Sequence, residues 1–363
     1  MSIDPPDSVP EHWHDEFADR YLEIRKERLE QYHEEEQRDR IERSLKKEQE
    51  HRKLLNMCIF PFSSSPSPSD FRFLRADPLE EKGLPNFDFL LWDFEGQAIF
   101  GEAKANIAQG PVSLLNEVRE QRQVVEDNME YIVEKYLGEE PRHVEYVLAT
   151  FAGDADQITR KAISESRDVV TWAIHQMEKS ISVNTVLPSE NDIPDGESLD
   201  DVNLRIKHSK RELNSTLSRA KSTEGSFNLF PESDPVTKLR TIITARYSEG
   251  GHCFVNVQEI SDIVDSDLFY LEESKREEIV DEIVEQGLEI GFLREYDETD
   301  ADYKIVSRYT HSDGLEDTLR RKWIDSQIDQ DIEEIEKECE RLAAKEVNRQ
   351  TQLWDYLDSE TMV

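Results

Sequence analysis

At 363 residues the chain is long enough for two or three domains of ordinary size. Its 81 acidic residues outnumber its 44 basic residues and give a net charge of -37, and only 36% of the residues are hydrophobic. Three widely spaced cysteines include no CxxC pair, no run approaches 18 apolar residues, and the first residues lack a basic and apolar leader. These features exclude a disulfide framework, a zinc ribbon and a membrane protein, and we expect a cytoplasmic protein.

Such a charge can mark a disordered chain, because a highly charged and weakly apolar sequence cannot offset its ordering entropy. Here the apolar residues fall into periodic segments with 5 Trp, 11 Tyr and 15 Phe, so we expect a folded protein with an acidic, solvated surface. Concentrated salt suits this surface, because the Debye length is about 3 Å at 1 M and self-repulsion is screened. The composition therefore indicates a halophilic protein. In such a protein the overall charge says little about partners that bind through Lys and Arg.

The chain begins with a charged segment. Residues 11–56 read as one long polar helix with a thin, broken apolar stripe and no sustained heptads. We therefore expect residues 1–56 to form a helical arm that contacts a protein partner or a second copy of the chain. SSSPSPSD at 63–70 predicts a loop.

From residue 85 to about 186 the pattern changes to strands alternating with helices, which predicts an α/β core with a mixed sheet over residues 57–186. FDFLLWD (87–93) and AIFGEAKA (98–105) flank the turn DFEGQ and predict a β-hairpin. The other expected elements are an amphipathic helix at 113–137, a buried strand at 144–151 and two helices within 154–179.

One group of charged residues lies inside this apolar hairpin. Glu102 and Lys104 alternate along a strand, so their side chains share one face while Ala103 faces the other. If the turn centres on Glu95, Asp88 lies across from Glu102, with Cβ atoms about 4.5–5.5 Å apart. Two carboxylates that close repel unless a cation lies between them, and Mg²⁺ takes oxygen ligands of this kind. The cation would acidify a water molecule, which Lys104 would hold while neutralising developing charge.

The segment PNFDFLLWDFEGQAIFGEAKAN resembles the PD-(D/E)xK, or restriction-endonuclease-like, nuclease superfamily. The resemblance covers about residues 50–180. It implies that Asp88 and Glu102 bind Mg²⁺ or Mn²⁺ and that Lys104 is the catalytic lysine. Pro85 lies three residues before Asp88 rather than beside it, a departure that leaves the chemistry intact.

Two further features bear on this resemblance. The family often adds a Glu from a preceding helix, which implies Glu50 as a further catalytic residue and Glu48 as the alternative. RecB-type members carry a Q-x-x-x-Y element on the helix after ExK; Gln121 and Gln123 are present, but no Tyr follows at that offset, which argues against that subfamily. Acidic residues are also less dominant in this region than in the rest of the chain. Residues 50–186 hold 23 acidic and 14 basic groups, a net charge of -9.

The rest of the chain predicts a linker, a second module and a terminal helix. Residues 187–234 are rich in Pro, Gly, Ser and acid and read as a linker with a helical segment. Residues 235–309 resemble a winged helix, with three helices and then two strands. The third helix carries seven acidic residues against Lys275 and Arg276, whereas a helix that reads a DNA groove needs the reverse, so we expect a protein-contact module. Residues 310–363 predict a charged helix.

These observations predict a Mg²⁺-dependent nuclease that hydrolyses phosphodiester bonds, of DNA first and RNA second, in defence, repair or recombination. The alternative is a non-catalytic nuclease-fold or winged-helix protein that binds nucleic acid or another protein. An intact set of Asp88, Glu102 and Lys104 favours the enzyme, because a binding module has no need for adjacent buried acids.

Overall fold

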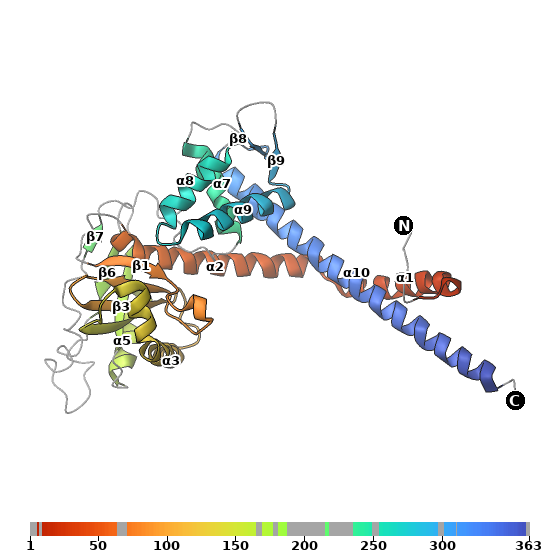
Figure 1. Ribbon diagram of the computed structural model, residues 1–363, viewed down its shortest axis with the longest axis horizontal. Coiled ribbons are helices and arrows are strands. Elements are labelled where there is room, and N and C mark those ends of the chain that lie inside the picture. The colour runs from red at the N-terminus through yellow and green to blue at the C-terminus, as the bar shows by residue number, and fades with distance from the viewer. Residues whose placement is uncertain are drawn as a thin grey trace. The chain divides into compact units, whose positions relative to one another are not determined.

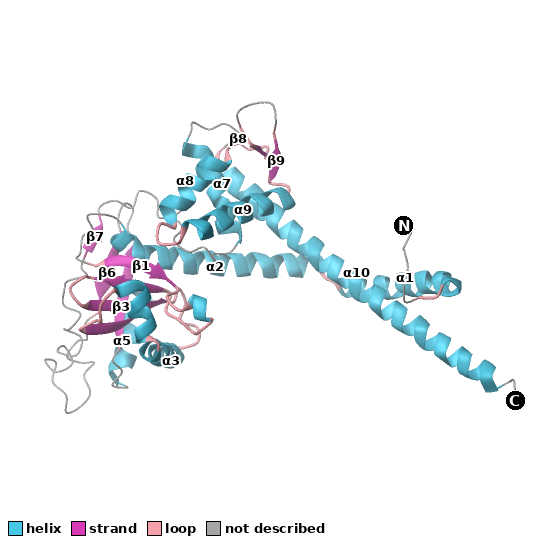
Figure 2. Cartoon of the chain, viewed as in Figure 1, coloured by secondary structure: helices cyan, strands magenta, loops and turns pink. Residues whose placement is uncertain are grey.

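The computed structural model contains two compact units (Figures 1 and 2). It describes residues 6, 9–63, 71–164, 169–176, 181–186, 215–217, 235–248, 254–296, 301–309 and 311–360. The first unit comprises Met1–Leu45, Leu288–Phe292 and Ser307–Val363, and the second comprises Lys46–Gly287 and Leu293–Val306. Within the described ranges, no helix is long and apolar enough to cross a membrane.

The first unit pairs two helices that lie far apart in the sequence. Helix α1 (His14–Gln31) runs antiparallel to α10 (Ser312–Glu360), and Arg25 Nε donates a hydrogen bond of 2.8 Å to Glu336 Oε1. The sparse apolar residues of both helices share one buried cluster, which includes Phe17, Tyr21, Ile24, Cys339, Ala343 and Val347. The charged N-terminal arm therefore buries its apolar stripe against the charged C-terminal helix.

The segment predicted as one helix over 11–56 is two helices. After the short η1 (Glu11–Trp13), α1 ends at Gln31, and the next residue, Tyr32, has an extended backbone with φ -83° and ψ 106°. Helix α2 (Glu34–Ser63) begins with three glutamates in its first turn, where negative charge is favoured by the helix dipole. It also continues beyond the predicted end at residue 56, and its last turns are apolar.

The second unit contains a seven-stranded mixed sheet in the order β1-β2-β3-β4-β5-β6-β7. Strands β1 to β3 are antiparallel, β3 to β5 are parallel, and β5 to β7 are antiparallel again. The strands are β1 (Arg72–Ala76), β2 (Phe89–Trp92), β3 (Gln97–Ala103), β4 (His143–Phe151), β5 (Val170–Gln176), β6 (Ile181–Thr185) and β7 (Ser215–Leu217). The predicted α/β core with a mixed sheet is therefore confirmed.

Each face of the sheet packs against helices, because successive strand residues point to opposite sides. On one face the C-terminal half of α2 contributes Leu54, Met57 and Ile59 to a cluster that includes Ile99 and Ala103. On the other face α3 (Pro111–Asp127) and α5 (Ala152–Ser164) pack on alternate strand residues; this cluster includes Leu90, Phe100, Leu114, Val118, Leu148 and Ile158. The strands of the hairpin are therefore held between two apolar layers.

Some elements differ from the sequence-based expectation. Among the described residues of the segment 154–179, residues up to Ser164 belong to helix α5 and Val170–Gln176 form strand β5, where a second helix was expected. Residues 170–174 are all buried, and a run buried on both faces has no period that separates a strand from a buried helix. The helix predicted at 113–137 bends at Asn128 into α3, α4 (Met129–Ile132) and the π-turn η3 (Val133–Leu137). Of the expected linker, only 215–217 lies within the described residues, and it forms β7.

The second unit also contains the predicted helical module. Its helices are α7 (Pro235–Ser248), α8 (Val257–Asp267) and α9 (Glu273–Glu289), and its strands are β8 (Phe254–Val255), β9 (Leu293–Glu295) and β10 (Tyr303–Ile305). The three helices and the last two strands were predicted, whereas β8 was not; the strands pair antiparallel in the order β8-β10-β9. Tyr270, between α8 and α9, packs edge-on against Phe73 of β1 with ring centroids 5.1 Å apart.

Candidate active site

The β2–β3 hairpin brings the predicted residues together. Phe89 pairs with Gly101, which is the register expected for a turn centred on Glu95. Asp88 is the residue before β2, and extending this register by one pair would set it across from Glu102. Position 101 accommodates only glycine, because a Cβ atom there would lie 1.9 Å from Cζ of Phe89. The sequence of the hairpin therefore favours this pairing.

Glu102 and Lys104 lie on the same side of β3, as predicted. Lys104 Nζ is 2.7 Å from Glu102 Oε1, whereas Ala103 belongs to the apolar cluster on the face covered by α2. The backbone of Lys104 is tied to β4, because its N–H donates to the Ala149 carbonyl at 2.9 Å. The ExK residues therefore sit at the end of a strand that neighbouring strands hold in place.

Helix α3 supplies two side chains to this group. Gln121 Nε2 donates to Glu102 Oε2 at 2.9 Å and to the carbonyl of Asn86 at 2.6 Å. Glu117 accepts a hydrogen bond of 2.8 Å from Lys104 Nζ. Gln121 is one of the two glutamines, with Gln123, that were considered for the Q-x-x-x-Y element. It contacts Glu102 although no Tyr follows at that offset. Glu117 was not predicted as a site residue.

Asp88 is held by the backbone of the opposite strand. Its Oδ2 accepts a hydrogen bond of 2.6 Å from the N–H of Ala103. Burial raises the pKa of Asp88 well above its usual range, and the Glu102 carboxylate raises it further, against the opposing effect of the Ala103 N–H. Burial also raises the pKa of Glu102, although Lys104 and Gln121 act in the opposite direction. Ionisation of either carboxyl group in the folded protein therefore costs free energy.

Lys104 is affected differently. Burial lowers the pKa of Lys104, but the two carboxylates, Glu102 and Glu117, outweigh burial and leave the pKa above its ordinary value. The lysine is therefore a stable ammonium ion at neutral pH. It can donate hydrogen bonds and neutralise negative charge, but it is not a proton acceptor.

A cavity of about 340 Å³ adjoins Asp88. Its walls include His51 of α2, Asp77 after β1, and Asn86. Asp77 has a positive φ of 47°, and its N–H donates to the Asp88 carbonyl at 3.2 Å. The side-chain amide of Asn86 has no hydrogen-bond partner among the described residues. Buried polar groups are nearly all hydrogen-bonded in native proteins, so a water molecule or another polar group is expected to satisfy this amide.

His51 and Asp77 were not predicted as site residues. Strand β1 was not anticipated, so the Asp that follows it could not be placed; an Asp-Pro pair after an apolar run was the available signal. Burial lowers the pKa of His51, with Lys104 acting in the same direction and Glu48 against it. His51 is therefore a neutral imidazole at neutral pH.

The expected fourth acid is not at the cluster. Glu50 in α2 is exposed, and it makes no hydrogen bond or ion pair with Asp88, Glu102 or Lys104, all of which are described residues. The alternative, Glu48, pairs with Arg52 at 2.9 Å. A helix places successive residues about 100° apart, and the turn of α2 that reaches the cavity presents His51 instead.

The donor atoms fit a divalent cation through a pair of carboxylates. In the part of the chain that is described, no three His, Cys, Asp or Glu side chains converge as a metal-binding group. Mg²⁺ in proteins is commonly bound by one or two carboxylates, with water and phosphate oxygens completing its shell. Asp88 and Glu102 are carboxylates of this kind, and a cation bound to them would offset the burial of both groups and the effect of the Glu102 charge on Asp88.

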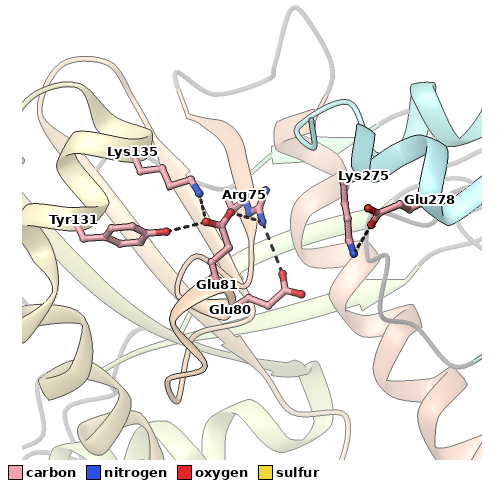
Figure 3. Close-up of polar contacts among 7 residues, drawn as sticks. All are labelled: Arg75, Glu80, Glu81, Tyr131, Lys135, Lys275 and Glu278. Carbon is pink, nitrogen blue, oxygen red and sulfur yellow. Dashed lines mark hydrogen bonds and ion pairs between the residues drawn. The ribbon is translucent and has the colours of Figure 1, made fainter. Parts of the chain in front are cut away.

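A larger cavity of about 540 Å³ in the same unit is lined by both signs of charge. Figure 3 shows that its cationic side chains face carboxylates: Lys135 donates to Glu81, Arg75 lies 3.6 Å from Glu81, and Lys275 lies 3.1 Å from Glu278. A phosphate group would have to compete with carboxylates already in place. We therefore do not regard this cavity as the site of chemistry.

Comparison with known proteins gives no independent assignment. No protein-family model, curated protein or solved structure matches the chain. A function must therefore be inferred from the chemistry of Asp88, Glu102, Lys104 and the residues that contact them.

Proposed function

We propose that this protein is a Mg²⁺-dependent nuclease of the PD-(D/E)xK, restriction-endonuclease-like class that hydrolyses phosphodiester bonds of DNA. The main support is the arrangement of Asp88, Glu102 and Lys104 at one end of the β2–β3 hairpin, with Lys104 Nζ 2.7 Å from Glu102. The mixed sheet with helices on both faces is compatible with the fold of that class. RNA is the alternative substrate, and defence, repair or recombination are the processes such an enzyme would serve.

Asp88 and Glu102 would hold Mg²⁺ or Mn²⁺. The bound cation would acidify a water molecule and stabilise negative charge on the phosphate. The protein orients both ligands in advance: the Ala103 N–H fixes Asp88, and the Gln121 amide fixes Glu102. Such supporting contacts matter because a site held loosely by its neighbours loses the geometry that the reaction needs.

Lys104 would donate a hydrogen bond to the attacking water and neutralise charge that develops on the phosphate. Its raised pKa keeps it charged for both tasks. His51 lines the cavity beside Asp88 as a neutral imidazole, so it is suited to accept a proton from that water. In this proposal Lys104 is the hydrogen-bond donor and His51 is the proton acceptor.

A binding function is the second candidate, and the helical module supports it. The three helices and the small antiparallel sheet resemble a winged helix, which supports this candidate. Residues 272–285 carry seven acidic side chains, which favours contact with a protein over contact with a DNA groove. We assign this role to the module alone, because it does not explain the buried acids of the hairpin.

Cleavage assays would test the nuclease proposal. Plasmid, linear and branched DNA and single-stranded RNA would be incubated with the protein in molar KCl, with and without Mg²⁺. We expect Mg²⁺-stimulated cleavage that Asp88→Asn, Glu102→Gln and Lys104→Ala abolish. Glu120→Gln, which removes an exposed acid from α3, is the matched control and should keep full activity. Absence of cleavage by the wild type on every substrate would refute the proposal.

A further inference from the structure

The ammonium group of Lys104 lies between two carboxylates that differ in environment. Its Nζ is 2.7 Å from Glu102 Oε1 on the same strand and 2.8 Å from Glu117 Oε1 on helix α3. The side chain of Glu102 is 5% exposed, whereas that of Glu117 is 38% exposed. One partner is therefore a buried member of the proposed site, and the other reaches Lys104 from helix α3 and is partly exposed.

We propose that Glu117 is a positioning residue for Lys104, an inference that rests on the proposed nuclease function. Glu102 would have two tasks, since it would bind a cation and also accept a hydrogen bond from Lys104. Its other oxygen is already occupied by Gln121. A carboxylate that shares its charge with a divalent cation attracts an ammonium group less strongly. Glu117 supplies a second negative charge that keeps Lys104 in place.

Helix α3 places Glu117 in position to contact Lys104. Glu117 and Gln121 are four residues apart, so they lie on the same face of the helix. The neighbouring Leu114 and Val118 are buried in the cluster that α3 shares with the sheet. The packing of α3 therefore fixes both polar residues at once: Gln121 on Glu102, and Glu117 on Lys104.

A purely structural ion pair would behave differently from a positioning contact. This ion pair is partly exposed, 23% at Lys104 and 38% at Glu117, and Lys104 keeps Glu102 as a partner, so loss of the Glu117 charge should cost little stability. Glu117→Gln should therefore leave the melting temperature close to that of the wild type. If Glu117 positions Lys104, the same substitution should act on turnover, because small displacements of a catalytic group are costly in rate.

The test compares Glu117→Gln and Glu117→Asp with Glu120→Gln, which removes an exposed acid of the same helix. We expect Glu117→Gln to lower kcat for Mg²⁺-dependent DNA cleavage about 10- to 100-fold, with KM little changed. Glu117→Asp, which keeps the charge, should recover part of this loss. Glu120→Gln should match the wild type.

A second measurement does not require activity. Lys104 would be labelled with an amine-reactive ester and its modification followed by mass spectrometry. Glu117→Gln should speed labelling of Lys104, because the ammonium group loses a partner, whereas Glu120→Gln should not. Unchanged labelling, or unchanged kcat in an active enzyme, would overturn the role of Glu117. An inactive wild type would instead refute the nuclease proposal and, with it, any role of Glu117 in turnover.

Discussion

The opposed carboxyl groups of Asp88 and Glu102 make a direct prediction about stability. Asp88→Asn removes one charge of the pair while keeping an oxygen that can accept the Ala103 N–H. Because burial and Glu102 raise the folded-state pKa of Asp88, the wild type loses stability as pH rises from the unfolded pKa through the folded one. The substitution should therefore stabilise the metal-free protein at pH 7.

The size of the effect follows from the geometry. Side chains opposed in this register have Cβ atoms about 5 Å apart, and two unit charges at that separation interact by roughly 3 kcal/mol at an effective dielectric constant of 20. The nearby Lys104 reduces this repulsion, so we expect a gain of about 1–3 kcal/mol. For a domain of this size the gain corresponds to a rise of about 2–10 °C in Tm.

Thermal unfolding with and without Mg²⁺ would measure both parts of the prediction. In molar KCl the nonspecific screening of a chain with net charge -37 is nearly complete, so millimolar Mg²⁺ changes it little. Mg²⁺ at ten times its Kd should stabilise the wild type by about 1.4 kcal/mol and should not stabilise Asp88→Asn. Glu120→Gln should respond as the wild type does. If Asp88→Asn is less stable without metal, or keeps the Mg²⁺ response, the carboxylate pair is not a cation site.

Three further predictions concern packing, pH and salt. Gly101→Ala should destabilise the fold by about 3 kcal/mol or more because its Cβ would overlap the Phe89 ring, and Phe89→Leu in the same chain should recover part of the loss in chemical denaturation. Because burial lowers the pKa of His51, its contribution to stability is present above the unfolded pKa of about 6.5 and is lost as pH falls below it. Tm of His51→Gln should therefore fall less steeply than that of the wild type on acidification; parallel curves would contradict this. Tm should also rise from dilute to molar KCl, since salt screens the excess of acid; a flat or falling Tm would remove the argument for salt adaptation.

The hairpin was predictable because the residues that define it lie close together in the sequence. Asp88 and Lys104 are only 16 residues apart, and the strand period and the turn fix which side chains share a face. The same local pattern could not place β1 or β5. Strand β1 is short, and the buried part of β5 carries no alternation. Burial by neighbouring strands decides such elements, and one sequence does not show those neighbours.

The residues around the carboxylate pair were harder to predict because they come from other elements. His51 reaches the site only because α2 packs on the sheet, and Asp77 only because β1 pairs with β2. Glu50 was expected from the resemblance, yet the rotation of α2 leaves it exposed. Which residue of a helix faces a site depends on how the helix packs, and a neighbouring position in the sequence does not share that face.

The local charges also explain how an acidic chain could act on a polyanion. Proteins that bind DNA through many phosphate contacts lose affinity steeply with salt, in proportion to the number of phosphates that Lys and Arg neutralise. Here Lys104 is engaged by Glu102 and Glu117, and Arg52 by Glu48. These two cations near the carboxylate pair therefore already neutralise carboxylates, and they would add little salt-dependent affinity for phosphate. At this site the phosphate would instead be joined to the protein by a divalent cation that Asp88 and Glu102 hold.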